Sequence, residues 1–196
     1  SSLAPAAAAV SSSPSILVIT VGAREKAALS QGISKCIPAW LCAKCDPARE
    51  VADKAERGLN LIPEKNRSKV IGACSGDIAE HCRDFIIRGS SSAIPAGTGG
   101  QEADEIRDHM DRMAVSALGA LADLVTSIVT VEQAIQLLQT VFPDEKGWKM
   151  VIANKRTSIR RAAYNFIARL ASKRDKSLLD FLASCGVSGL VLGSLS

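Results

Sequence analysis

The sequence has few aromatic residues and no long apolar run. Two Trp, one Tyr and four Phe account for 4% of the 196 residues, within a hydrophobic content of 47%. The scarcity of aromatic residues beside many Ala, Leu, Ile and Val favours close-packed helices over sheets built on aromatic pairs. The longest apolar runs, such as residues 16–19, are far shorter than the roughly 18 to 20 residues that a membrane-spanning helix needs. We therefore expect no membrane-spanning segment.

Motifs for catalysis and nucleotide binding are also missing. The two histidines, His81 and His109, belong to no nucleophile or metal motif, and no phosphate-binding loop of the G-x-x-x-x-G-K-S/T type occurs. The glycine-rich residues 97–100 follow no predicted strand and contain no lysine. The sequence therefore predicts no catalytic site, no cofactor and no bound metal in this chain.

The cysteine pattern favours reduced thiols in a helical core. A chain of this length can bury a sufficient core without disulfides, so a reducing compartment, the cytosol or the nucleus, is the preferred interpretation. A zinc module is the alternative, because Cys42 and Cys45 form a C-x-x-C and His81 and Cys82 follow; no second pair occurs at zinc-ligand spacing, however. The six cysteines are Cys36, Cys42, Cys45, Cys74, Cys82 and Cys185.

Helical periodicity extends over most of the chain. Residues 1–15 are a low-complexity leader without the basic start of a secretory signal, and residues 16–196 are predicted to form one helical domain with a flexible Gly/Ser/Pro-rich loop at 89–100. About eight amphipathic helices without a strand signal predict an all-α fold, either a bundle or antiparallel helix pairs. Pairs about 40 to 50 residues apart favour HEAT/ARM-like repeats, an α-solenoid fragment. The helices are expected at residues 34–46, 47–62, 70–89, 101–128, 130–141, 144–153, 157–170 and 177–184, with a further element near 190–192.

Capping residues mark several predicted helix starts. Asp46 suits an N-cap and Pro47 a first helical position, where the missing N–H costs nothing. Thr130 and Gln133 have the spacing of a capping box. Thr157 is predicted to cap the helix that follows it.

Basic residues gather in one part of the chain. Residues 144–176 contain ten Lys or Arg and three acidic residues, a local charge of +7 in a chain of net charge +4. Several of them lie around a predicted helix start, where the helix dipole adds positive potential. We predict an anion-binding surface here, with a solvated helix face as the alternative. The candidate residues are Lys149, Lys155, Arg156, Arg160 and Arg161.

Acidic residues gather where the long helix of residues 101–128 begins. Their position suits the positive end of the helix dipole, so a solvated helix start is a better interpretation than a partner site. These residues are Glu102, Asp104, Glu105, Asp108 and Asp111.

Two stretches carry a family resemblance. Residues 38–46, PAWLCAKCD, are followed by Val51, Ala55 and Leu59 at helical spacing and then by Pro63-Glu-Lys. The second stretch combines GWK at 147–149 with SIRRAAY at 158–164. Together, over about residues 33–184, they resemble the N-terminal domain of listerin, the large RING-type E3 ubiquitin ligase of ribosome-associated quality control. The chain departs from that family at Gly147, where an aromatic residue is usual, and in its Gly/Ser-rich loop, where the family has an acidic one.

The resemblance implies a HEAT/ARM-like ligase that ubiquitinates nascent chains stalled on the large ribosomal subunit. Its RING domain would lie at the far C-terminus, so this chain is expected to be a non-catalytic, monomeric docking domain. The partners implied are the large subunit near the sarcin–ricin loop and an Rqc2/NEMF-type quality-control factor, in the cytosol. The predicted basic cluster fits a ribosome-facing surface. A generic helical-repeat scaffold or transport adaptor that binds a protein partner is the alternative.

Overall fold

The computed structural model describes residues 23–90, 99–127 and 129–193, and every regular element within them is an α-helix. The all-α prediction is therefore confirmed. The helices are α1 (Ala23–Lys44), α2 (Arg49–Leu59), α3 (Glu64–Ala73), α4 (Ser75–Ser90), α5 (Gly100–Ser127), α6 (Val131–Val141), α7 (Glu145–Ile152), α8 (Thr157–Ser172), α9 (Lys176–Ser184) and α10 (Val187–Gly193).

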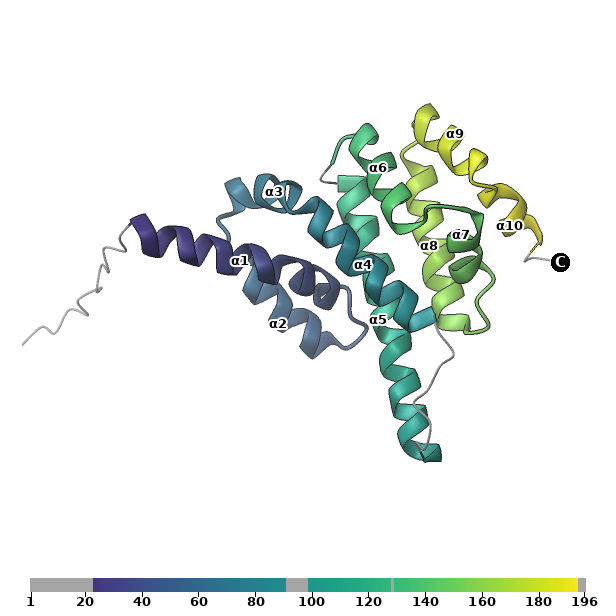
Figure 1. Cartoon of the computed structure of the whole chain (residues 1–196), viewed down its shortest axis with the longest axis horizontal. Helices are drawn as coiled ribbons and strands as arrows, with labels where there is room; N and C mark the ends of the chain where they lie inside the picture. Colours follow the sequence, from purple (N-terminus) through teal and green to yellow (C-terminus); the bar gives the residue numbers. More distant parts are fainter. Residues whose placement is uncertain (1–22, 91–98, 128, 194–196) are drawn as a thin grey trace, which may run out of the picture.

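The helices follow one another across the molecule, from α1 and α2 at one end to α9 and α10 at the other (Figure 1). At the centre α4 and α5 lie side by side, and α5 also packs against α8. The first half of α5 projects beyond its neighbours. No helix in the described part of the chain combines the length and the apolar character needed to cross a membrane.

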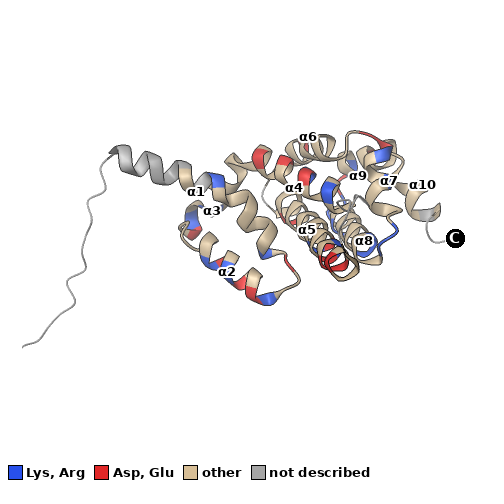
Figure 2. Cartoon of the chain, turned by 60° about the horizontal axis from the view of Figure 1, so that its bottom comes forward, with Lys and Arg blue, Asp and Glu red and all other residues tan. Residues whose placement is uncertain are grey.

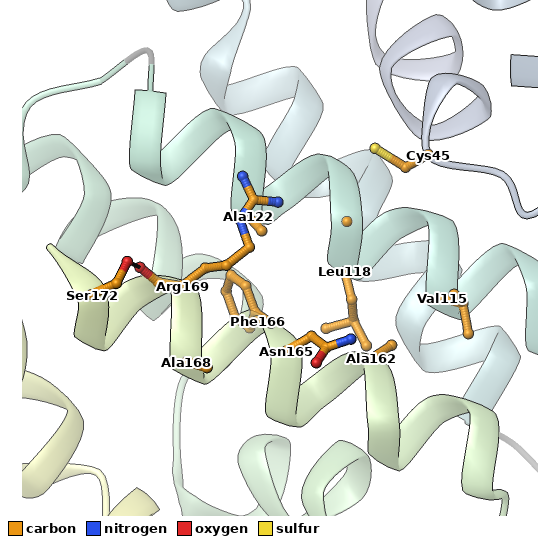
Figure 3. Close-up of a pocket in the computed structure, with 11 residues that line it drawn as sticks. Cys45, Val115, Leu118, Ala122, Ala162, Asn165, Phe166, Ala168, Arg169 and Ser172 are labelled. Carbon is orange, nitrogen blue, oxygen red and sulfur yellow. Dashed lines mark hydrogen bonds between the residues drawn. The ribbon is translucent and has the colours of Figure 1, made fainter. Parts of the chain in front are cut away.

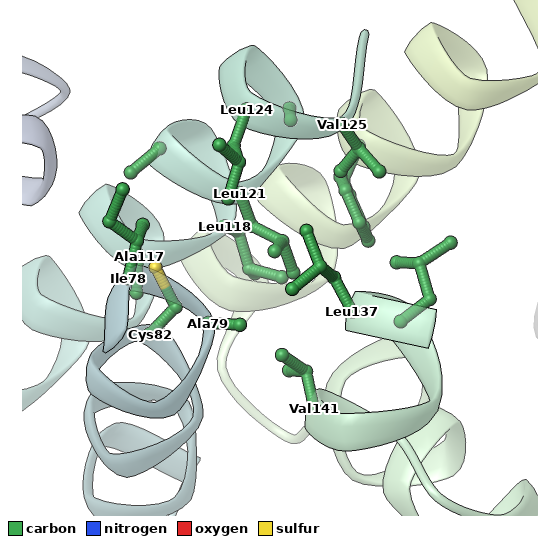
Figure 4. Close-up of a cluster of buried hydrophobic side chains, with 14 of the residues drawn as sticks. Ile78, Ala79, Cys82, Ala117, Leu118, Leu121, Leu124, Val125, Leu137 and Val141 are labelled. Atoms are coloured by element: carbon green, nitrogen blue, oxygen red, sulfur yellow. The ribbon is translucent and has the colours of Figure 1, made fainter. Parts of the chain in front are cut away.

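The core lies where α4, α5 and α6 meet (Figure 4). Each of these helices turns one aliphatic stripe inward, at the three- and four-residue spacing of an amphipathic helix. Burial of each large aliphatic side chain contributes about 1.5–3 kcal/mol, so this stripe pattern is sufficient to join the three helices. Labelled members of the cluster are Ile78, Ala79, Cys82, Ala117, Leu118, Leu121, Leu124, Val125, Leu137 and Val141.

Gly89 lets α4 and α5 approach closely. A Cβ at this position would lie 2.5 Å from the Ala114 Cβ and 2.5 Å from the Met110 carbonyl oxygen. Packed atoms are not found that close together, so a side chain at residue 89 would force the two helices apart.

Both tryptophans fill space between helices. Trp40 of α1 lies under Gly58 of α2, where a Cβ would come within 2.8 Å of the indole Cε2. Trp148 of α7 is fully buried and stacks on Phe142, with ring centroids 4.3 Å apart. The two residues at the centre of the family-like stretches are therefore packing residues.

One of the three predicted caps is confirmed and two are wrong. Thr130 and Gln133 form the capping box, as predicted. The predicted start of α2 is two residues early, because the Asp46 Oδ1 accepts a hydrogen bond from the Ala48 N–H at 2.7 Å and thereby closes the turn before the helix. Thr157 is the first residue of α8 and does not cap it.

The structure changes three predicted boundaries. α1 begins at Ala23, well before residue 34, since its first half is rich in helix-forming residues without an apolar stripe. The single helix expected at 70–89 is two helices, which a break at Cys74 separates. α4 continues to Ser90, so the predicted loop cannot begin at residue 89; residues 91–98 of that loop, the leader at 1–15 and Ile128 lie outside the described residues.

Candidate functional site

Arg156, one of the predicted anion-binding residues, is committed to the fold. Its guanidinium forms an ion pair with the Asp111 carboxylate of α5 and donates a hydrogen bond to the Gly89 carbonyl oxygen of α4 at 2.8 Å. Only 16% of its side chain is exposed. Ser158 also donates to Asp111, at 2.9 Å. These contacts fasten the start of α8 to both central helices.

Arg160 is engaged in a similar way, within its own turn. Its guanidinium donates to the carbonyl oxygens of Asn154 at 2.6 Å and Lys155 at 3.0 Å, and to the Thr157 hydroxyl at 3.2 Å. These bonds satisfy carbonyl groups in the turn between α7 and α8 that have no helical partner. The Arg160 guanidinium therefore stabilises this turn and has fewer N–H donors left for an anion.

The remaining predicted cations are exposed, and two of them line a cavity. Lys149 and Lys155 face a concave surface of about 450 Å³ between α7, the α7–α8 turn and the end of α4. We call this cavity the lysine groove. Arg161 is exposed on α8 and does not line it. The lining residues are Ser90, Lys146, Lys149, Met150, Ala153, Asn154, Lys155 and Arg156.

Local sequence explains how the lysines come together. Lys146 and Lys149 are three residues apart on α7 and so share a face of that helix. Asn154 then shapes the turn, because its side chain donates to the Met150 carbonyl at 2.9 Å and accepts the Arg156 N–H at 3.0 Å. Lys146 was not among the predicted site residues, although its spacing from Lys149 is a signal that would have found it.

The lysine groove is suited to anions. Four of its lining residues are cationic and none is a carboxylate. Lysine ammonium groups are compact point charges on flexible stems, which suits a row of phosphates better than one fixed ligand. No side chain caps the N-terminus of α8, so the helix dipole adds positive potential nearby. Basic residues lie along the turn that leads into α8 (Figure 2).

Comparison with protein-family models shows which family the chain belongs to. The sequence model of the N-terminal domain of E3 ubiquitin-protein ligase listerin matches residues 15–194. The chain belongs to this family. Neither the search of curated proteins nor that of solved structures found a match. The resemblance carried by the two tryptophan-containing stretches is thus confirmed over almost the whole chain.

This listerin-family domain also has a cluster of thiols, to which α1 and α4 contribute. The Sγ atoms of Cys42 and Cys82 are 3.7 Å apart, and the Cys45 thiol donates to the Asp123 carboxylate at 3.8 Å. Burial raises the pKa of Cys45 to about 12, and the hydrogen bond with Cys42 together with burial raises the pKa of Cys82 well above its usual value. Both thiols are therefore favoured in their protonated form.

The zinc alternative receives no support from the arrangement of ligands. In the described ranges, no three or more His, Cys, Asp and Glu side chains are placed to hold a metal ion. His81 instead packs against Phe85 in a tilted arrangement, with ring centroids 4.3 Å apart, and burial lowers the pKa of His81.

A second concave surface of the listerin-family domain is apolar. It is a groove of about 540 Å³ between α5 and α8, which we call the α5–α8 groove (Figure 3). Buried Leu118, Ala122 and Phe166 form its floor. Arg169 lies at its edge and pairs with Asp123 at 2.7 Å. A surface of this kind suits a protein segment better than a nucleic acid, because it offers contact area and little free charge.

Proposed function

We propose that this domain docks a listerin-type ubiquitin ligase onto the large ribosomal subunit, where the lysine groove contacts ribosomal RNA phosphates. The observation that carries the proposal is the composition of that groove, in which three exposed lysines and no carboxylate line one concavity. Phosphate contacts of this type supply affinity and orientation without reading base sequence. A docking role of this kind requires no catalytic site in this chain.

The proposal includes the antiparallel HEAT/ARM-like arrangement and a cytosolic, ribosome-associated, monomeric domain. Packing of α1 on α2 and of α4 on α5 is consistent with successive helix pairs. In such an arrangement one face can meet the ribosome while another remains open to a protein.

A second candidate function, a scaffold that binds a protein partner, is favoured by the apolar α5–α8 groove. An Rqc2/NEMF-type factor would be the partner within ribosome-associated quality control. Ala168→Glu tests this role, since residue 168 is exposed and lines the groove. Capture of that factor in the absence of ribosomes should fall at least tenfold. Equal capture by the variant would contradict a role for the groove.

Co-sedimentation with purified large ribosomal subunits tests the principal proposal. The variant Lys146→Glu/Lys149→Glu/Lys155→Glu should bind at least tenfold more weakly at about 0.1 M salt, because three favourable phosphate contacts become repulsive. Arg156 and Arg160 stay unchanged in this variant, because their contacts hold the fold.

The matched control is Lys35→Glu/Lys65→Glu/Lys69→Glu, which makes the same change of net charge at exposed positions on α1 and α3. It should lose little affinity. Equal losses in both triple variants would mean that net charge alone governs binding, and unchanged binding of the groove variant would remove the groove from the interface.

A further inference from the structure

The projecting half of α5 is a second charged surface, of opposite sign. We call residues 100–113 the α5 arm. It carries five carboxylates and two arginines, and Arg107 already pairs with Asp104. Acidic residues gather at the end of the arm that comes forward in Figure 2. Apolar Ile106, Met110 and Met113 are only half-buried, so the arm combines negative charge with accessible apolar surface.

A small cavity lies at the base of this arm, between α1, α4 and α5. Its volume is about 260 Å³, which is below the usual range for small-molecule sites and fits one inserted side chain. We call it the arm pocket. Its walls are mostly apolar, and Cys42, Asp46 and His109 are the charged or titratable residues among its lining. The lining residues are Ala39, Cys42, Ala43, Asp46, Phe85, His109, Met113 and Ser116.

One polar side chain in the lining of the arm pocket, Ser116, lacks a hydrogen-bond partner. The residue is only 3% exposed, and its hydroxyl has no hydrogen-bond partner. Thr126 on the same helix shows the ordinary solution, since its hydroxyl donates to the Ala122 carbonyl oxygen at 2.6 Å. A buried hydroxyl without a partner is unfavourable. A ligand that brings a polar atom to Ser116 would remove that penalty.

Helical spacing places two acidic residues of the arm on the same face of α5 as the residues that line the arm pocket. Glu102, Glu105, His109, Met113 and Ser116 follow one another at intervals of three or four residues, so they share one face of α5. A segment lying along this face would meet two glutamates first and the arm pocket next. The charge complementary to this face is positive.

We propose that the α5 arm and the arm pocket bind a cationic amphipathic segment of a partner protein. One anchor side chain with an apolar body and a polar tip, such as tyrosine, enters the pocket and reaches Ser116. Lys or Arg residues flanking that anchor pair with Glu102 and Glu105. The carboxylates of the arm repel phosphates, so a nucleic acid is not the ligand of this surface. The proposal does not depend on docking through the lysine groove.

The methionines provide a test that separates this surface from the lysine groove. The chain contains three: Met110 and Met113 on the arm, and Met150 in the lining of the lysine groove. Methyl-labelled methionine therefore gives an NMR spectrum that reports both surfaces. The probe is a synthetic helical peptide with lysines flanking one tyrosine, and the matched peptide has glutamate at every lysine.

The lysine peptide should shift the Met113 methyl signal and leave Met150 in place. A short RNA duplex should do the reverse if the lysine groove binds phosphates. No shift at Met113, equal shifts with the glutamate peptide, or a Met113 shift with RNA would overturn the proposal. If the RNA duplex leaves the Met150 methyl signal unchanged, that result contradicts only the proposal that the lysine groove binds phosphates.

Two variants locate the binding. Glu102→Lys/Glu105→Lys changes only exposed side chains and should weaken lysine-peptide binding about tenfold, whereas Glu64→Lys/Asp180→Lys, elsewhere on the surface, should change it less than twofold. Ser116→Leu fills the pocket and should weaken binding at least fivefold. If Ser116→Leu fails to fold in a thermal melt, the glutamate variant decides, and unchanged affinity there overturns the proposal.

Discussion

The lysine groove and the α5 arm differ in charge and in the way the chain builds them. The three lysines of the groove lie within residues 146–155, on one short helix and the turn after it. The pocket at the arm instead combines side chains of α1, α4 and α5, which come from between residues 39 and 116. Local spacing therefore suffices to assemble a cationic surface, whereas an enclosed pocket requires the packing of separate helices.

Asp111, Arg156 and Gly89 form a junction between the lysine groove and the α5 arm. Asp111 lies near the base of the arm and forms its ion pair with Arg156, which lines the lysine groove. Gly89 joins the same junction, since its carbonyl oxygen accepts from Arg156 while its Cα faces Met110 and Ala114. The charges nearest the boundary thus neutralise each other, and the exposed charges on either side keep opposite signs.

Gly89→Ala should have the largest effect, because it forces α4 from α5 at this junction. We expect the free energy of unfolding to fall by about 3 kcal/mol and the melting temperature by roughly 10 °C, as calorimetry would measure. Gly76→Ala in the same helix is the control, since no atom lies within 4 Å of the added Cβ. It should leave stability unchanged or raise it by up to about 1 kcal/mol. Equal melting temperatures for the two variants would refute the close-packing argument.

The second largest effect is expected in the salt dependence of RNA binding, which distinguishes the lysine groove from the α5 arm. If the three groove lysines each neutralise a phosphate, replacing them with glutamine should reduce the log–log slope of affinity against salt by about 2.7. This is roughly a 40-fold difference in salt response between 50 and 200 mM, or about 2 kcal/mol. Fluorescence anisotropy with a labelled RNA duplex measures the slope. An unchanged slope would show that the phosphate contacts lie elsewhere.

Asp111→Ala should destabilise the fold by about 2 kcal/mol, because the mostly buried Arg156 loses its ion pair and Ser158 its acceptor. Asp104→Ala removes the exposed partner of Arg107 on the same helix and should cost less than about 0.5 kcal/mol. Urea denaturation of both variants measures the difference. Similar losses would mean that the junction is no more important than a surface pair.

Neutralising the arm should have the smallest effect. Glu102→Gln/Glu105→Gln is expected to raise RNA affinity about twofold at low salt, through weaker long-range repulsion of phosphates. The same anisotropy titration detects the change, which should vanish at about 1 M salt. Reduced RNA affinity in this variant would place the arm in the RNA interface and contradict the contrast drawn between the surfaces.

Much of the helical fold could be predicted from the sequence, because apolar spacing and caps are local signals. The capping box at Thr130 and the charge concentration around Lys149 and Lys155 were both readable in this way. The break at Cys74 was not, since the four-residue apolar stripe continues across it. The engagement of Arg156 could not be foreseen either, because its partner Asp111 is 45 residues away.

The sequence by itself determined the all-helical class, the family and the location of the basic segment. Tertiary structure alone decided which of the basic residues remain free to meet an anion, and that Ser116 lies buried without a partner. The physical reason is that helix formation and net charge depend on neighbours along the chain. The accessibility of a charge and the enclosure of a pocket depend instead on which distant helices pack against it.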